Sequence, residues 1–215
     1  MKLPSVKNPT EPNALIIVDF QNDFCKNGSL EVKGGELIGP LLNKLKENKF
    51  FDVVFLTADW HQANHFSFYT NHPGKKIKDV ITVPLTGESI ILWPPHCIQG
   101  QEGSNFYNTL KVDSKDIIVH KGKFQYSDSF SAFGNSYDST LLKPRLQHLG
   151  VKKVFLCGIT LEYCVFETAK DAVEEGFETY VILDACAALY PQDSLEVERK
   201  MVDSKINLIW SSNIL

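Results

Sequence analysis

The chain has 215 residues, of which 43% are hydrophobic and 22% charged, so it can bury one substantial core, and we expect a single domain over residues 1–215. A formal net charge of −4 without Lys/Arg-dense runs argues against nucleic acid or an anionic membrane surface as a partner. No apolar run approaches the ~20 residues that span a bilayer, and the start has no signal-peptide core. We therefore expect a cytoplasmic protein, with residues 1–12 as a poorly structured extension.

Six short runs rich in β-branched residues predict strands along the chain. They are continuous rather than alternating, which is typical of strands buried on both faces. The runs lie at 14–20, 52–58, 116–121, 153–158, 179–185 and 207–210, and helical patterns lie between most of them, at 35–48, 139–150 and 164–176. This alternation predicts an α/β fold with a mostly parallel sheet and helices on both faces. The long interruption at 60–115 is of a length that is usually functional.

Residues that could act in catalysis or binding lie where the predicted strands end. Asp19 follows the first strand, Asp59 and His61 the second, and Lys121 the third, and the turn 158–164 follows the fourth. Because ligands bind beyond the carboxyl ends of strands in open parallel sheets, we expect these residues to share one site.

Cys164 is the candidate nucleophile. It falls in what the pattern predicts to be the first turn of a helix, where free N–H groups stabilise a thiolate. Lys121 would lower the thiol pKa, and Asp19 could take the thiol proton and return it to a leaving group. Backbone N–H groups of the preceding turn could hold an oxyanion. The alternative is that Cys164 is an ordinary buried core thiol, as free cysteines often are.

A second group of residues has the chemistry of a metal site. Asp59, His61 and His65 lie within seven residues, and His96 follows two prolines. Imidazoles with one carboxylate suit zinc, iron or manganese. Spacing alone does not fix the distant His96, and histidines in loops are often solvent-facing.

Three aromatic residues near these elements, Phe24, Trp93 and Phe130, could form the walls of a flat pocket for an aromatic ligand. The alternative is that they belong to the core, which is the commoner place for aromatic side chains.

The stretches "VDFQNDFC", "TADWHQANHFSF", "WPPHCIQG", "HKGK" and "GITLEYCVFETAKDA" resemble the signatures of the nicotinamidases, within the isochorismatase-like cysteine hydrolase superfamily. The match runs in order from about residue 14 to 187. It implies a six-stranded, Rossmann-like sheet and a cis peptide between Ile159 and Thr160, with the N–H groups of Thr160 and Cys164 as oxyanion donors.

The resemblance also implies an activity and a cofactor. Asp19, Lys121 and Cys164 would form a triad that hydrolyses nicotinamide to nicotinic acid and ammonia through a thioester, feeding NAD salvage. A divalent metal, with zinc expected and iron or manganese as alternatives, would be held by Asp59, His61 and His96. His65 matches a position that binds the metal directly in some members and through a water in others.

Two rival hypotheses stay open at this stage. One is an amidase or carbamoyl hydrolase of the same superfamily that acts on a non-aromatic substrate, and the other is a non-catalytic metal-binding or interaction protein. The sequence also leaves open whether the chain forms a homo-oligomer. Finally, no proposed metal ligand is among the groups expected to activate Cys164, so we expect metal removal to leave alkylation of this thiol within a few-fold of its original rate.

Overall fold

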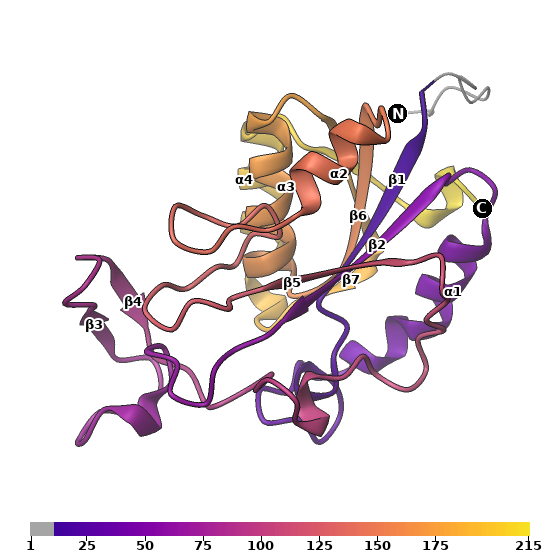
Figure 1. Cartoon of the computed structure of the whole chain (residues 1–215). Helices are drawn as coiled ribbons and strands as arrows, with labels where there is room; N and C mark the ends of the chain where they lie inside the picture. Colours follow the sequence, from indigo (N-terminus) through magenta and orange to yellow (C-terminus); the bar gives the residue numbers. More distant parts are fainter. Residues whose placement is uncertain (1–10) are drawn as a thin grey trace.

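A computed structural model describes residues 11–215 as an α/β fold around one six-stranded sheet (Figure 1). The strands of this sheet are β1 (Asn13–Val18), β2 (Val53–Asp59), β5 (Ile117–Lys121), β6 (Lys153–Ile159), β7 (Glu178–Ala187) and β8 (Asn207–Ile209). All their pairings are parallel. The predicted strands and the predicted fold class are thereby confirmed. Most of the extension expected at 1–12 lies outside the described residues.

The sheet order is β5-β2-β1-β6-β7-β8, so β1 lies between β2 and β6. The chain proceeds outward from β1 in one direction as far as β5 and then returns to the other side of β1 as β6. The carboxyl ends of β1 and β6 therefore flank the place where the strand order reverses, which is where open α/β sheets bind ligands.

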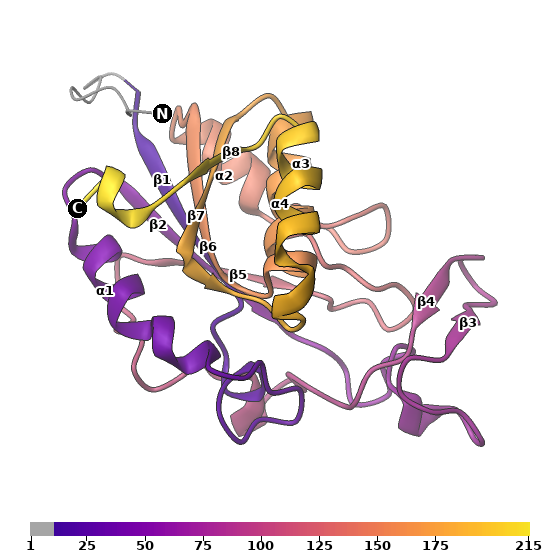
Figure 2. The ribbon, with the colours of Figure 1, turned by 180° about the vertical axis from the view of Figure 1, so that it is seen from behind.

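Helices cover both faces of the sheet (Figures 1 and 2). They are α1 (Gly39–Glu47), α2 (Leu142–His148), α3 (Phe166–Glu174) and α4 (Ser194–Asp203). Alternate residues of β1 point to opposite faces: Ile16 packs in the core beneath α2, α3 and α4, and Leu15 packs in the core beneath α1. Burial on both faces explains why the strands read as continuous apolar runs.

The segment 60–115 contains a small antiparallel hairpin that was not predicted, formed by β3 (Val80–Thr82) and β4 (Ser89–Ile91). It stands away from the main sheet (Figure 1). Its strands have three residues each, too few to show a clear period in the sequence.

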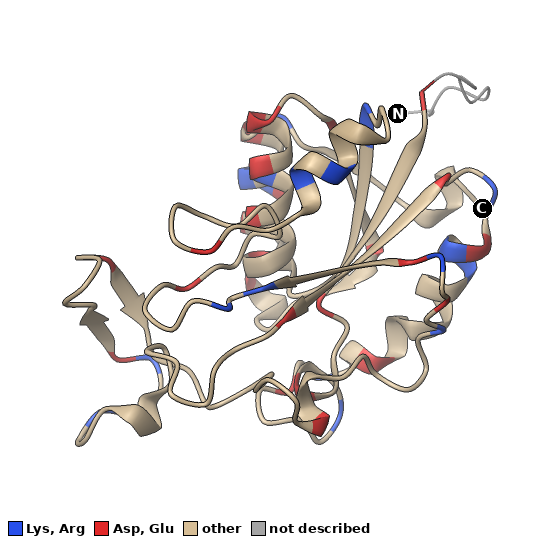
Figure 3. Cartoon of the chain, viewed as in Figure 1, with Lys and Arg blue, Asp and Glu red and all other residues tan. Residues whose placement is uncertain are grey.

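Charged residues of both signs are scattered over the elements (Figure 3), in keeping with the mixed composition. Within residues 11–215, no helix is both long and apolar enough to cross a membrane.

Candidate functional site

Four adjacent strands, β5, β2, β1 and β6, carry the candidate residues at their carboxyl ends. Lys121 and Asp59 are the last residues of β5 and β2 and face each other in the register. Asp19 follows β1, and Thr160 follows β6. The parallel topology thus brings together residues that lie more than 140 positions apart in the chain, as the strand-end pattern predicted.

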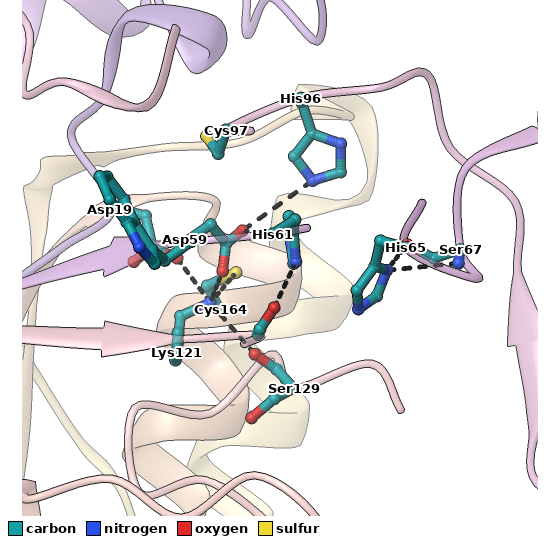
Figure 4. Close-up of polar contacts among 12 residues, drawn as sticks. Asp19, Asp59, His61, His65, Ser67, His96, Cys97, Lys121, Ser129 and Cys164 are labelled. Carbon is teal, nitrogen blue, oxygen red and sulfur yellow. Dashed lines mark hydrogen bonds and ion pairs between the residues drawn. The ribbon is translucent and has the colours of Figure 1, made fainter. Parts of the chain in front are cut away.

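Lys121 lies at the centre of the site and is fully buried (Figure 4). Its ammonium nitrogen is 2.8 Å from Asp19 Oδ2, 2.5 Å from Asp59 Oδ1 and 3.4 Å from Cys164 Sγ. It also donates to the backbone carbonyl of Ser129 at 3.2 Å. Burial alone would lower the pKa of Lys121, but the carboxylates of Asp19 and Asp59 outweigh it and hold the pKa well above its ordinary value. Lys121 is therefore a permanent positive charge beside the sulfur.

Asp19 and Cys164 are placed to share a proton. Burial raises the pKa of both groups, although Lys121 opposes the rise in each case. Thr57 Oγ1 donates to Asp19 Oδ1 at 2.6 Å and fixes the carboxyl group. A buried acid whose pKa is raised binds a proton more readily than an exposed one, which suits Asp19 to accept and release a proton during a reaction.

The turn before α3 holds Cys164. The Ile159–Thr160 peptide is cis, which confirms that prediction. Residues Leu161–Val165 form a π-helical turn, in which Val165 N–H donates to the Thr160 carbonyl at 3.0 Å. Cys164 lies, as expected, in the first turn of the helix, but this turn is π-helical and runs directly into α3 at Phe166. The wider turn contains one more residue per hydrogen-bonded ring, a feature that apolar spacing does not encode.

Asp59, His61 and His96 form a compact buried group whose candidate ligand atoms all lie within 4.8 Å of one another. Each imidazole donates its Nδ1–H to a backbone carbonyl, His61 to Gly122 at 2.8 Å and His96 to Pro94 at 2.7 Å. The other ring nitrogen of each, Nε2, faces Asp59 Oδ2, at 3.5 Å for His61 and 3.9 Å for His96, and can bind a metal when it carries no proton. One carboxylate and two oriented imidazoles fit a divalent metal.

His65 lies beside this group but is not part of it. Its ring centre is 4.5 Å from that of His61, and its Nδ1 is hydrogen-bonded to Ser67 Oγ at 2.8 Å. Within the described residues, its buried Nε2 has no hydrogen-bond partner. Burial and the neighbouring His61 and His96 lower the pKa of His65 to about 3, so the ring is a neutral donor or acceptor at the margin of the metal group.

Asp59 belongs to both groups of residues and links them directly. One carboxylate oxygen, Oδ1, accepts from Lys121, and the other, Oδ2, faces the two histidines (Figure 4). A charge change at the histidines therefore reaches Lys121, and through it the sulfur, across a single side chain.

A cavity lies beside these residues, with Asp59 and His96 in its lining. The three predicted aromatic residues, Phe24, Trp93 and Phe130, all line it, together with Thr160 and Cys164. The residues that sequence reasoning missed in its lining are Leu30, Asp128, Ser129, Tyr163 and Leu189.

Tyr163 and Asp128 are the most informative of the missed residues. Tyr163 contacts both Trp93 and Phe130, with ring centres 5.3 and 5.4 Å away, and its place directly before Cys164 in the sequence could have pointed to it. Asp128 has a buried Oδ2 without a hydrogen-bond partner in the described part of the chain. It lies in a loop without a repeating pattern, so nothing in the sequence pointed to it.

Comparison with known proteins identifies the family. Residues 13–205 match the Isochorismatase domain. The chain belongs to the isochorismatase family. A member of known activity, the nicotinamidase of Acinetobacter baylyi, is 39% identical over 205 residues, which cover 94% of each chain.

Two solved structures of relatives superpose closely on this isochorismatase-family chain. The yeast nicotinamidase Pnc1p bound to the inhibitor nicotinaldehyde has a TM-score of 0.87 at 30% identity, covering 92% of this chain and 99% of that one. The pyrazinamidase of Pyrococcus horikoshii in complex with zinc has a TM-score of 0.76 at 33% identity, covering 92% and 98%.

Proposed function

We propose that this chain is a nicotinamidase that hydrolyses the carboxamide of nicotinamide to nicotinic acid and ammonia. The observation that carries the proposal is the position of Cys164 Sγ, 3.4 Å from the Lys121 ammonium at the wall of an aromatic-lined cavity. Lys121 in turn pairs with Asp19 at 2.8 Å. The 39% identity to a curated nicotinamidase and the nicotinaldehyde complex of a close structural relative support the same substrate.

In the proposed mechanism Asp19 takes the proton of the Cys164 thiol, and the thiolate attacks the carboxamide carbon. The N–H groups of Thr160 and Cys164 hold the oxyanion of the tetrahedral intermediate. Asp19 gives its proton to the amide nitrogen, the C–N bond breaks, and ammonia leaves a thioester on Cys164. Asp19 then takes a proton from a water that attacks the thioester carbon; the C–S bond breaks, nicotinic acid leaves, and Asp19 returns the proton to the sulfur of Cys164.

A divalent metal fits the site, and we propose that Asp59, His61 and His96 hold it. When bound, it would supply a Lewis acid that binds and orients the pyridine ring nitrogen of the substrate. The zinc complex of the pyrazinamidase supports zinc as the metal. His65, whose buried Nε2 has no partner in the residues described, would hold a metal-bound water rather than the metal itself.

Several broader proposals accompany this one. We propose that the chain acts as one domain, that it works in the cytoplasm, and that its product enters NAD salvage. Whether it forms a homo-oligomer stays a prediction to be tested in solution.

The deciding experiment is to incubate the zinc-loaded protein with nicotinamide and measure ammonia and nicotinic acid together. We expect equal amounts of the two products. Benzamide, which lacks the ring nitrogen, and an aliphatic amide of similar size serve as comparison substrates. If the aliphatic amide were hydrolysed as well as nicotinamide, the chain would be an amidase of another specificity, and if no amide were hydrolysed, the enzymatic proposal would fail.

A further inference from the structure

Gln21 makes an unusual set of contacts between the two groups of residues. It lies two positions after Asp19 and is fully buried. Its side-chain Oε1 accepts from the backbone N–H of Asp59 at 2.8 Å, and its Nε2 donates to the backbone carbonyl of the same residue at 2.9 Å. The second hydrogen of Nε2 is donated to the carbonyl of Ser104 at 2.9 Å. One side-chain amide therefore binds both backbone polar groups of Asp59.

The sheet explains why Asp59 needs such a partner. The register between β1 and β2 ends at Ile17 and Leu56, three residues before Asp59. Beyond it the chain turns out of the sheet at Asp19, whose φ of 46° is left-handed. The amide of Gln21 thus replaces the missing backbone of β1, and it satisfies groups that would otherwise be buried and unpaired.

Two functions depend on where Asp59 is held. Its Oδ1 must meet Lys121 at 2.5 Å, while its Oδ2 must face the Nε2 atoms of His61 and His96. Bond lengths to a metal tolerate shifts of only about 0.2 Å, so a loosely held Asp59 would weaken metal binding.

We propose that Gln21 is a positioning residue, which fixes the backbone of Asp59 so that this carboxylate serves the metal group and Lys121 together. The proposal rests on the proposed metal site but not on the identity of the substrate. Glutamine suits the task because it offers a donor and an acceptor at one end of a side chain. Glutamate would place an oxygen against the carbonyls of Asp59 and Ser104, and methionine would fill the space without any hydrogen bond.

The test compares Gln21→Met with Asn22→Ala. Asn22 is a control because its Nδ2 donates to the carbonyl of Glu102 at 2.8 Å. Like the bond from Gln21 to Ser104, this one joins the segment after β1 to residues 102–104, but it does not involve Asp59. The dissociation constant for Zn²⁺ is measured by competition with a chelator, at a temperature well below unfolding of each protein by circular dichroism. We expect Gln21→Met to raise the constant roughly 10- to 100-fold, as loss of an outer hydrogen bond to a metal ligand typically does. Asn22→Ala should change it less than about 3-fold on the same scale.

A merely structural role predicts a different result, in which both variants unfold at lower temperature and bind Zn²⁺ like the wild type. A folded Gln21→Met protein with wild-type affinity would overturn the proposal. Should that variant not fold, Gln21→Asn keeps the amide but withdraws it by one methylene, and wild-type Zn²⁺ affinity in Gln21→Asn would overturn the proposal equally. Failure of the proposed function looks different, because the wild type itself would then bind no Zn²⁺ or release no nicotinic acid.

Discussion

The group around Cys164 and the group around His61 are built in different ways. Asp19 follows the central strand β1, Lys121 ends the edge strand β5, and both are fully buried, so the sheet itself fixes their spacing. In the second group only Asp59 lies on a strand, and His61 and His96 lie in the long segment between β2 and β5. Their rings are oriented by hydrogen bonds to the carbonyls of Gly122 and Pro94.

This difference shows which contacts each group depends on for its geometry. The first depends on strand topology, which many packing contacts support, whereas the second depends on a few local contacts of loop residues. The shared residue, Asp59, is the point at which a disturbance of the second group reaches the first.

The largest effect should come from Cys164→Ala. Loss of the nucleophile should lower kcat at least ~1000-fold, because Cys164 is the only cysteine among the described residues that line the cavity. Zn²⁺ affinity should stay within a few-fold, since Cys164 is not among the three proposed ligands. Nicotinic acid release and chelator competition on the same preparation check both statements.

Cys157→Ala is the matched control for that variant, because it also removes a buried sulfur, from β6, but away from the cavity. It should keep its activity. Adding Asp19→Asn to Cys164→Ala should cost little more, since residues that act as a unit are not additive. Strictly multiplicative losses would contradict a shared role for Asp19 and Cys164.

The second prediction weakens the metal group alone. A Cβ added at Gly122 would lie 2.4 Å from His61 Cε1 and 2.7 Å from its Nδ1, so Gly122→Ala must displace the ring. We expect Zn²⁺ affinity to fall roughly 10- to 100-fold. Gly150→Ala is the control, because Gly150 has a similar φ of 70° but open space around its Cβ position. Equal losses of Zn²⁺ affinity in both variants would show that backbone strain, not His61, is responsible.

The same contrast explains which parts of the fold and site could be predicted from the sequence. The strands and the positions of Asp19, Asp59 and Lys121 follow from apolar runs and from the rule that parallel strands share one edge. The small hairpin, Asp128 and the contacts of Gln21 could not be predicted, because they depend on loops whose course is set by tertiary contacts. The link through Asp59 was missed for a related reason: the sequence places it beside His61 but does not show that β2 and β5 are neighbours in the sheet.

The third prediction measures that link. Without metal, the carboxylates of Asp19 and Asp59 both face Lys121, so its positive charge stabilises the Cys164 thiolate less. Removing the metal should therefore slow alkylation of Cys164 by iodoacetamide roughly 3- to 10-fold, about 1 kcal/mol. His61→Ala should have the same effect, since His61 is one of the proposed ligands. Mass spectrometry resolves Cys164 from the four other cysteines. An unchanged rate would restore the independence that the sequence suggested.

The smallest effect concerns Asp128, the further carboxylate in the cavity lining. Burial raises its pKa from 3.8 to about 6, with His61 opposing the rise. The neutral acid therefore favours the folded state, and this contribution is fully present below about pH 4 and lost as the pH rises through 6. Asp128→Asn keeps a neutral side chain at every pH, so the metal-free variant should be more stable than the metal-free wild type above pH 6.

A shift of two pKa units corresponds to at most ~3 kcal/mol, and we expect about 1 kcal/mol, or a rise of a few degrees in Tm at pH 7.5. At pH 4 the two proteins should have the same Tm. The control Asp203→Asn, at an exposed position on α4, should change the Tm at neither pH. Bound metal should reduce the difference in Tm between Asp128→Asn and the wild type at pH 7.5, because its positive charge stabilises the nearby Asp128 carboxylate. A metal-free Asp128→Asn protein that is less stable at pH 7.5 would instead show that attraction between Asp128 and His61 outweighs the cost of burial.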